Sequence, residues 1–496
     1  MVNYAKLAVR GAGFLFMSSV VSAGFAYLAR IFLARSLSVE EFGLFFAVFS
    51  LFSFLELFKD LGLTSALIKY ISEFRAKKQF NNIKTVSYMS GVIQLSFAFI
   101  ISVIVVLMSR YLSTNYFKNE GAMPLIIILS IWFFVSTIQG WIFSIFYGFK
   151  RFFLFSFKDI SRDVFYFISL VILLKLGYGV LSPAYAWLIA TIVSVVIFFP
   201  ILFKVFNFFK YKFQNHKPLS KKLVLFGLPV TLTSIGGKII GRIDILMLTY
   251  FRSLSEVGVY SIILPTSLLV LLVGKALSMV MFPIGSELWA KKEVKRLTAG
   301  LKLMLKYGFL AAVPIGLAFI SFGRLFLNLF FGKEYVVGVL AFQILIIGTL
   351  FVIIGQINNA VISSIGQPVR VTKVILVSAG VNLVLNLILI PLFGIEGAAI
   401  STTISYILIC FLSIKELTKI MKFKAPWVDW AKTIVSGVIF VLLIILLRKI
   451  LVMNPWIELF LILFIAGIIY LISIFFFKII TFSEFKNIKN TFFNIK

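Results

Sequence analysis

The segment Arg35-Ser-Leu-Ser-Val-Glu-Glu-Phe-Gly-Leu-Phe45 returns in altered form as Arg252-Ser-Leu-Ser-Glu-Val-Gly-Val-Tyr260. The corresponding glycines, Gly43 and Gly258, are 215 residues apart. A second pair of similar segments begins at Ser72 and Ser286, which are 214 residues apart. Two matches with nearly the same offset indicate an internal repeat, since weak internal similarity of this kind marks a chain built from duplicated halves.

The composition places these repeats in a membrane protein. Hydrophobic residues make up 61% of the 496-residue chain and charged residues 13%, which excludes a soluble globular domain, a disordered chain and a coiled coil. A helix that crosses a bilayer needs about 20 apolar residues. The sequence has about fourteen segments of that length, at 11–34, 42–68, 86–109, 123–148, 158–176, 183–205, 223–250, 257–284, 302–323, 338–364, 371–392, 397–419, 432–452 and 456–478.

The repeat offset covers six of these predicted helices. Because six is even, the two copies have the same orientation in the membrane, and the axis that relates them runs along the membrane normal. We therefore expect an all-α polytopic membrane protein with about fourteen transmembrane helices, in which two parallel-repeat six-helix bundles surround a central cavity. The predicted parts are a first bundle at 1–206, a basic cytoplasmic linker at 207–222, a second bundle at 223–420, and two further helices with a cytoplasmic tail at 421–496.

Basic residues are distributed unevenly among the loops. The chain has 48 Lys and Arg against 18 Asp and Glu, and about 34 of the basic residues fall on one side of the predicted membrane, as the positive-inside rule requires of a cytoplasmic face. About ten lie on the other side. We expect a multi-pass protein of the plasma membrane with both termini in the cytoplasm. Since the same rule accounts for the net charge of +30, we expect no nucleic-acid partner.

Residues typical of enzymes and metal sites are scarce. Cys410 and His216 are the only cysteine and histidine of the chain, which excludes an internal disulfide and a Cys/His zinc site. The sequence has neither a G-x-x-x-x-G-K-[ST] loop nor an H-E-x-x-H motif, and its loops are too short for a domain with the paired carboxylates of glycosyl-transfer chemistry. We expect no catalytic residue, no metal site and no cofactor, with Na⁺ or H⁺ as the conceivable coupling ion.

Charged residues inside the predicted spans are the candidates for a site. An ionisable side chain at a helix centre costs about 2.5–3.5 kcal/mol on insertion scales, so such groups usually face a cavity or pair with one another. The basic residues in the spans outnumber the acidic ones. The candidate substrate-binding residues are Arg30, Lys59, Asp60, Lys238, Arg242, Asp244 and Lys275, with Glu56 beside them.

The surplus of positive charge favours an anionic ligand. Lys59 lies 16 residues after Gly43, and Lys275 lies 17 residues after Gly258. The two lysines therefore occupy nearly equivalent depths in equivalent helices. We expect them to face each other across the central cleft.

Internal pairing is the alternative for these charges. Glu56 and Lys59 are three residues apart, so they can form an ion pair on one helix face. Asp159, Arg162 and Asp163 form another charged group, which we interpret as a self-neutralising cluster near the cytoplasmic end of its helix.

Several motifs resemble those of polysaccharide and O-antigen-unit flippases of the multidrug/oligosaccharidyl-lipid/polysaccharide exporter superfamily. The resemblance covers the chain from residue 1 to about 420 and implies a V-shaped cavity between two six-helix bundles, alternating access, and basic cavity residues that meet the phosphates of a lipid-linked substrate. The similar segments are 35–43, Asp60-Leu-Gly62, Phe282-Pro283, Ile365-Gly-Gln-Pro368, and the stretch from Asn382 through Asn386 and Pro391 to Gly397.

The predicted function is therefore that of a flippase, not of an enzyme. It would move a lipid-linked oligosaccharide that bears phosphate or pyrophosphate from the cytoplasmic to the outer leaflet. Its partners would be this substrate, membrane lipids, and glycosyltransferases or a polymerase of the same pathway. An ion-coupled multidrug or metabolite exporter of the same superfamily is one alternative, and a membrane-embedded glycosyl-transfer or polymerase enzyme is the alternative from another class.

Cysteine labelling tests the predicted topology. In a Cys410→Ser background, single cysteines in the basic loops should be shielded from an impermeant thiol reagent added to intact cells, because these loops are predicted to be cytoplasmic; the positions are Lys77, His216 and Lys292. Cysteines at Asn119 and Lys333 should be labelled. Labelling of position 216 from outside would reverse the orientation and the predicted direction of transport.

Overall fold

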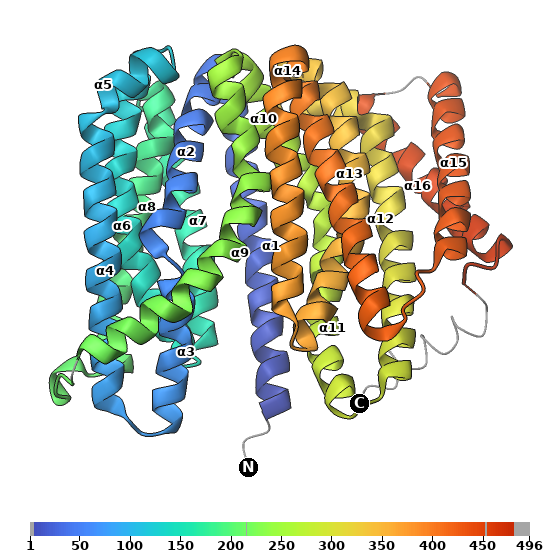
Figure 1. Ribbon diagram of the computed structural model, residues 1–496. Helices are drawn as coiled ribbons and strands as arrows, with labels where there is room; N and C mark the ends of the chain where they lie inside the picture. Colours follow the sequence, from blue (N-terminus) through green and yellow to red (C-terminus); the bar gives the residue numbers. More distant parts are fainter. Residues whose placement is uncertain (1–3, 215, 452–453, 481–496) are drawn as a thin grey trace. The chain divides into compact units, whose positions relative to one another are not determined.

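The computed structural model describes residues 4–214, 216–451 and 454–480, and all regular elements in these ranges are helices (Figure 1). By their internal packing the helices form two compact units. Unit 1 comprises Met1–Ile262 and Leu383–Ile395, and unit 2 comprises Ile263–Asn382 and Glu396–Lys496. The predicted all-α membrane architecture is thereby confirmed.

Unit 1 contains eight long helices and the start of a ninth. α7 packs against α1 and α8, while α6 contacts α2, α3, α4 and α8. Short elements at Ser109–Tyr111 (α5), Leu112–Tyr116, Gly179–Leu181 and Phe208–Lys210 lie in the connections. The long helices are α1 (Tyr4–Ser36), α2 (Val39–Asp60), α3 (Leu63–Ala76), α4 (Phe80–Leu107), α6 (Ala122–Gly148), α7 (Phe152–Lys175), α8 (Ser182–Val205), α9 (His216–Phe251) and α10 (Leu254–Ser267).

Unit 2 contains the end of α10 and the remaining helices, except for Leu383–Ile395 of α14, which belongs to unit 1. Within it, α11 packs against α12 and α13, and α15 packs between α12 and α16. Phe322, Phe440 and Tyr470 belong to the core that joins the last two helices to α12, and the Tyr470 hydroxyl donates to the Leu310 carbonyl at 2.9 Å. The helices are α11 (Leu271–Ala290), α12 (Val294–Phe330), α13 (Val339–Ser364), α14 (Pro368–Met421), α15 (Trp427–Ile450) and α16 (Pro455–Phe476), with short helical turns at Leu268–Val270 and Lys333–Gly338.

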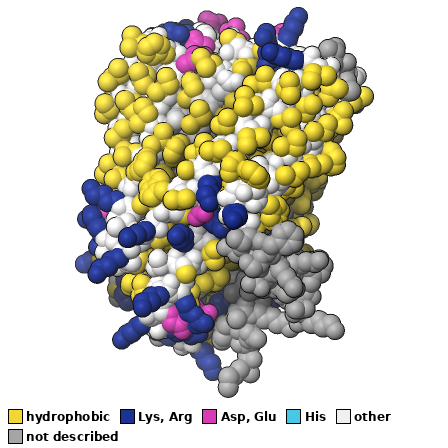
Figure 2. Space-filling view, turned by 90° about the vertical axis from the view of Figure 1, so that its right-hand side faces the viewer, with side chains coloured by type: hydrophobic (Ala, Val, Ile, Leu, Met, Phe, Trp, Pro, Cys, Tyr) yellow, Lys and Arg dark blue, Asp and Glu magenta, His cyan; other side chains and the backbone are white. Residues whose placement is uncertain are grey.

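The lipid-facing character of the helices is visible on the surface. Large apolar side chains are exposed along α4 and α16, among them Phe99, Ile100, Phe460 and Phe464. Figure 2 shows hydrophobic side chains over much of one face, with Lys and Arg gathered toward its lower end. Exposed apolar surface of this extent is what a bilayer covers, since monomeric soluble proteins rarely show it.

The number of membrane spans is less simple than the sequence predicted. Eleven helices in the described residues are long and apolar enough to cross a membrane, or up to twelve when the two segments of α9, bent by 48°, count as one span. α7 is not among them, and it carries four charged residues between Lys158 and Asp163. α14 is 54 residues long and consists of two helices that meet at Gly394, whose φ of 57° and ψ of −128° break the helix.

The linker between the predicted bundles also differs from expectation. α9 begins at His216, inside the predicted 207–222 linker, and it packs against α2, α3 and α4 within unit 1. The two units are defined by packing, whereas the two predicted bundles are defined by the sequence repeat, which assigns 223–420 to the second bundle. The two divisions therefore need not coincide. The repeat boundaries remain a prediction.

Glycines allow α2 and α10 to cross with their backbones in contact. A Cβ atom at Gly43 would overlap the Leu254 carbonyl oxygen and would lie 2.8 Å from the Gly258 nitrogen. A Cβ at Gly258 would in turn overlap the Val39 carbonyl oxygen. The two glycines that the sequence aligns as equivalent positions of the repeat are therefore packed against each other within unit 1.

Substitution of Gly43 tests this contact. Gly43→Ala should lower the free energy of unfolding by at least about 1–3 kcal/mol. The new methyl group would clash with backbone atoms of α10, which cannot move aside as a flexible side chain could. The matched control is Gly24→Ala in α1, where a Cβ would meet nothing within 4 Å; there the change should be neutral or stabilising by up to about 1 kcal/mol. Thermal unfolding of the purified variants in detergent measures both, and equal stability of the two variants would contradict the crossing.

Candidate functional site

A cavity of about 340 Å³ lies within unit 1, among α2, α3, α4, α6, α7, α8 and α9. Three of the predicted site residues line it, namely Lys59, Asp60 and Lys238. Glu56, which the sequence places beside them, lines it too. The sequence therefore identified the residues that α2 and α9 contribute to this cavity.

Lys59 is a buried cation, with 8% of its surface exposed. Its ammonium group donates to the Ser136 hydroxyl at 2.8 Å and to the Phe133 carbonyl at 3.3 Å, and it lies 4.1 Å from the centre of the Phe133 ring. In the part of the chain that the structure describes, no carboxylate forms an ion pair with Lys59. Its charge is stabilised by neutral acceptors and by an aromatic face.

Glu56 pairs with a different lysine from the one that the sequence suggested. The Lys238 ammonium lies 2.9 Å from a Glu56 carboxylate oxygen and also donates to the Ser53 carbonyl at 3.1 Å. The alternative of a Glu56–Lys59 ion pair on one helix face is therefore wrong. The reason is tertiary, since α9 packs directly on α2 and presents Lys238 to the Glu56 side chain.

Asp60 is held by neutral donors. One of its carboxylate oxygens, Oδ1, accepts from the Thr64 backbone amide at 3.1 Å and from the Gln94 side-chain amide at 3.0 Å. The Thr64 hydroxyl donates to the same oxygen. These bonds fix the carboxylate where α2 ends, beside Leu61 and Gly62, which both have positive φ angles.

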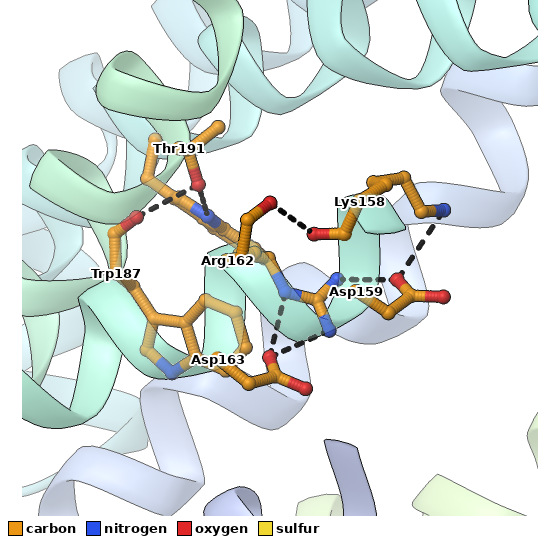
Figure 3. A network of polar contacts seen from close by, with 8 residues as sticks. Lys158, Asp159, Arg162, Asp163, Trp187 and Thr191 are labelled. Atoms are coloured by element: carbon orange, nitrogen blue, oxygen red, sulfur yellow. Dashed lines mark hydrogen bonds and ion pairs between the residues drawn. The ribbon is translucent and has the colours of Figure 1, made fainter. Parts of the chain in front are cut away.

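The charged cluster of α7 is self-paired, as the sequence suggested. The Arg162 guanidinium lies 2.8 Å from Asp163 and 3.5 Å from Asp159, and Lys158 lies 3.4 Å from Asp159 (Figure 3). Arg162 also lies 5.2 Å from the centre of the Trp187 ring. Sequence reasoning missed that Lys158 and Arg162 line the cavity together with Trp187.

Two predicted arginines of unit 1 lie outside the cavity lining. The Arg30 guanidinium donates to the Ser261 carbonyl and lies 4.6 Å from the centre of the Phe46 ring. Arg242 makes neither a hydrogen bond nor an ion pair with the described residues. Neither arginine forms an ion pair with a carboxylate in the described ranges, although Glu56 lies within electrostatic range of Arg242.

Asp244 and Lys275 have separate surroundings. The Asp244 side chain is fully buried, and its carboxylate accepts from the Tyr260 hydroxyl at 2.7 Å and from the Asn386 amide at 2.6 Å. Lys275 is a half-buried residue of α11 in unit 2. Its predicted position opposite Lys59 remains a prediction.

Neutral residues of the cavity were not predicted from the sequence. Gln94, Gln139, Trp132, Trp141 and Trp187 line it, but they carry no charge that stands out in an apolar segment. The available signal was the presence of two glutamines within predicted spans, because a side-chain amide in a membrane helix needs hydrogen-bond partners.

Comparison with protein families identifies the class to which this fold and site belong. The family model described as "Polysaccharide biosynthesis protein" matches residues 8–289, which is more than half of the chain, and the MatE model matches 229–388. The chain belongs to the polysaccharide biosynthesis protein family. The predicted resemblance to polysaccharide flippases of the multidrug/oligosaccharidyl-lipid/polysaccharide exporter superfamily is confirmed.

Individual relatives agree with this assignment. The chain is 30% identical to an uncharacterized membrane protein of Methanocaldococcus jannaschii, over 98% of this chain and 99% of the relative. It is 24% identical to the probable low-salt glycan biosynthesis flippase Agl15 of Haloferax volcanii, over 96% and 97% of the two chains. These full-length similarities are to a membrane protein and to a protein described as a probable flippase.

Solved structures of the same fold include two kinds of transporter. The lipid II flippase MurJ in an inward closed conformation superposes with a TM-score of 0.76 at 17% identity, covering 92% of this chain and 97% of MurJ. An inward-facing multidrug resistance MATE transporter superposes with a TM-score of 0.66 at 15% identity, covering 81% and 94% of the two chains. The fold is thus shared with a lipid II flippase and with a MATE transporter.

A double-mutant cycle tests the ion pair between α2 and α9. Glu56→Ala and Lys238→Ala should show a coupling energy of up to about 1 kcal/mol, because both side chains are about one-third exposed and water screens their attraction. The matched control is the cycle of Glu56→Ala with Lys84→Ala, which should show no coupling because the Lys84 ammonium donates to the Tyr211 carbonyl and does not act on Glu56. The apparent free energy of unfolding in detergent gives both values, and the absence of coupling between Glu56 and Lys238 would contradict the ion pair.

Proposed function

We propose that this membrane protein is a flippase that moves a lipid-linked oligosaccharide from the cytoplasmic to the outer leaflet. The observation that carries the proposal is the pair of arginines, Arg30 and Arg242, which lie in helices of unit 1 and form no ion pair with a carboxylate in the described ranges. Two such cations in membrane-embedded helices are stabilised by an anionic ligand, since a guanidinium fork holds phosphate through two parallel bonds. The flippase relatives support the same class of substrate.

Moving a phosphate-bearing head group across a bilayer requires basic residues of this kind. A phosphate or pyrophosphate group crosses hydrocarbon only when its charge is compensated. Basic side chains in a polar cavity provide that compensation, while the lipid tail stays in the bilayer. Lys59, Lys238 and, from unit 2, Lys275 are proposed to add to the positive potential that attracts the head group.

The proposal includes the membrane arrangement that the sequence predicts. Counting α7 and both helices of α14 as spans brings the structure toward the predicted fourteen, arranged as two six-helix bundles and the C-terminal pair α15 and α16. The termini are proposed to be cytoplasmic in a plasma-membrane protein, with glycosyltransferases or a polymerase of the same pathway as partners. This topology sets the direction of transport.

An ion-coupled exporter of drugs or metabolites is the second candidate. It is favoured by the MatE model match at 229–388 and by the structural similarity to MATE transporters. In that case Na⁺ or H⁺ would drive transport, and the cavity would bind neutral or cationic molecules. A coupling ion is compatible with the flippase proposal as well.

Charge substitutions separate the two candidates. Lys275→Arg should keep much of the transport activity and Lys275→Glu should abolish it, because the sign of the charge matters most for an ammonium group. Arg242→Lys should be costlier than Lys275→Arg, since a lysine lacks the guanidinium fork. Accumulation of the lipid-linked precursor on the cytoplasmic face measures activity, with the abundance of each variant in the membrane measured in parallel.

The glutamate variants decide the outcome. If Lys275→Glu and Arg242→Glu both flip the precursor normally at normal abundance, an anionic substrate site is excluded. The function would then be that of an exporter of neutral or cationic small molecules.

A further inference from the structure

A residue that lines the unit 1 cavity has an unpaired amide donor. Gln139 of α6 is 7% exposed and lines the cavity, yet its side-chain nitrogen Nε2 has no hydrogen-bond partner among the described residues. Buried polar groups of proteins are nearly always hydrogen-bonded. The unpaired donor therefore points to an acceptor that the chain itself does not supply.

An unpaired acceptor lies in the same cavity. All three hydrogen bonds of Asp60 go to its Oδ1 atom. Its second oxygen, Oδ2, accepts no hydrogen bond from the residues that the structure describes. The cavity thus offers both a free donor and a free carboxylate acceptor.

The charges that line the cavity are largely balanced. Lys238 is paired with Glu56, and Arg162 and Lys158 are paired with the acids of α7. Lys59 is the remaining cation, and Asp60 is the remaining acid. The lining also holds two carboxylates, those of Glu56 and Asp60, which a phosphate group placed here would have to approach.

Hydroxyl groups fit this set of atoms better than phosphate does. Each hydroxyl both donates and accepts, so hydroxyl groups of a sugar can satisfy both the Asp60 oxygen and the Gln139 amide. Gln94 and Ser136 lie on the same lining and fix the two charged groups, Asp60 and Lys59, through their side chains. The polar surface is therefore rigid enough to select among hydroxyl patterns.

We propose that the unit 1 cavity is a sugar subsite, in which Asp60 Oδ2 accepts from, and Gln139 Nε2 donates to, hydroxyls of the oligosaccharide. This inference rests on the proposed function and deepens it, because it separates recognition of the sugar from compensation of the phosphate charge by Arg30 and Arg242. Asp60 and Gln139 determine which sugar is bound, and the arginines do not.

Binding of two matched lipids tests the subsite. The probes are a long-chain polyprenyl phosphate and the same lipid carrying a single hexose, with glucose, mannose, galactose and N-acetylglucosamine forms measured in parallel by native mass spectrometry of the solubilised protein. The wild-type chain should bind at least one glycosylated probe about tenfold tighter than the bare lipid phosphate. Gln139→Leu and Asp60→Asn should remove this preference while leaving the affinity for the bare lipid phosphate.

Two control variants sharpen the comparison. Arg242→Gln should weaken both probes by the same factor, because both carry phosphate. Gln343→Leu changes a glutamine of α13 in unit 2, whose amide already donates to the Ile320 carbonyl, and it should leave both affinities unchanged. It controls for the general effect of removing a glutamine from a membrane helix.

Two results of these binding measurements would overturn different parts of the proposal. Equal affinity of the wild-type chain for bare and glycosylated probes, or a preference that survives in Gln139→Leu, overturns the sugar subsite and leaves the flippase proposal standing. Failure of the wild-type chain to bind any of the probes overturns the lipid-linked substrate, and the subsite with it.

Discussion

The contact between the backbones of α2 and α10 is the constraint on which the placement of the site depends. Gly43 contacts the carbonyl of Leu254, which lies four residues before Gly258. Gly258 in turn contacts the carbonyl of Val39, which lies four residues before Gly43. A contact that maps onto itself when the two segments are exchanged is what a local two-fold relation produces. The repeated sequence and the reciprocal contact therefore describe the same feature.

A second close contact holds the other end of α2. Leu61 and Gly62 have positive φ angles, and a Cβ on Gly62 would overlap the Gly227 carbonyl of α9. Glu56, Lys59 and Asp60 lie between the two glycine contacts. Their charged groups are thus carried by a segment fixed at both ends, which keeps them at the cavity wall although each has a strong tendency to reach water.

Much of this arrangement was predictable from the sequence, and what was not predictable depends on tertiary packing. Lys59, Asp60 and Lys238 stood out because charges in apolar helices are rare. The partner of Glu56 was not predictable, since residues three apart on one helix were as plausible as a lysine on a helix 182 residues away in sequence. Gln139 was missed because a neutral amide carries no charge, and the candidates were only the charged residues of the predicted spans. The span count was uncertain where α7 carries charges and where Gly394 breaks α14.

The two polar regions of unit 1 differ in a way that suits selective transport. The guanidinium groups of Arg30 and Arg242, which form no ion pair with a carboxylate in the described ranges, attract any phosphate, so they contribute affinity with little selectivity. A cavity whose charges are balanced attracts little at a distance. When the wrong ligand occupies it, some of its buried polar groups are left without a hydrogen-bond partner, and this cost discriminates strongly between ligands. A carrier that must also release its cargo gains from keeping these functions apart. The phosphate then provides an attraction common to all lipid-linked precursors, and the hydroxyl pattern decides which of them is held long enough for the helices to rearrange.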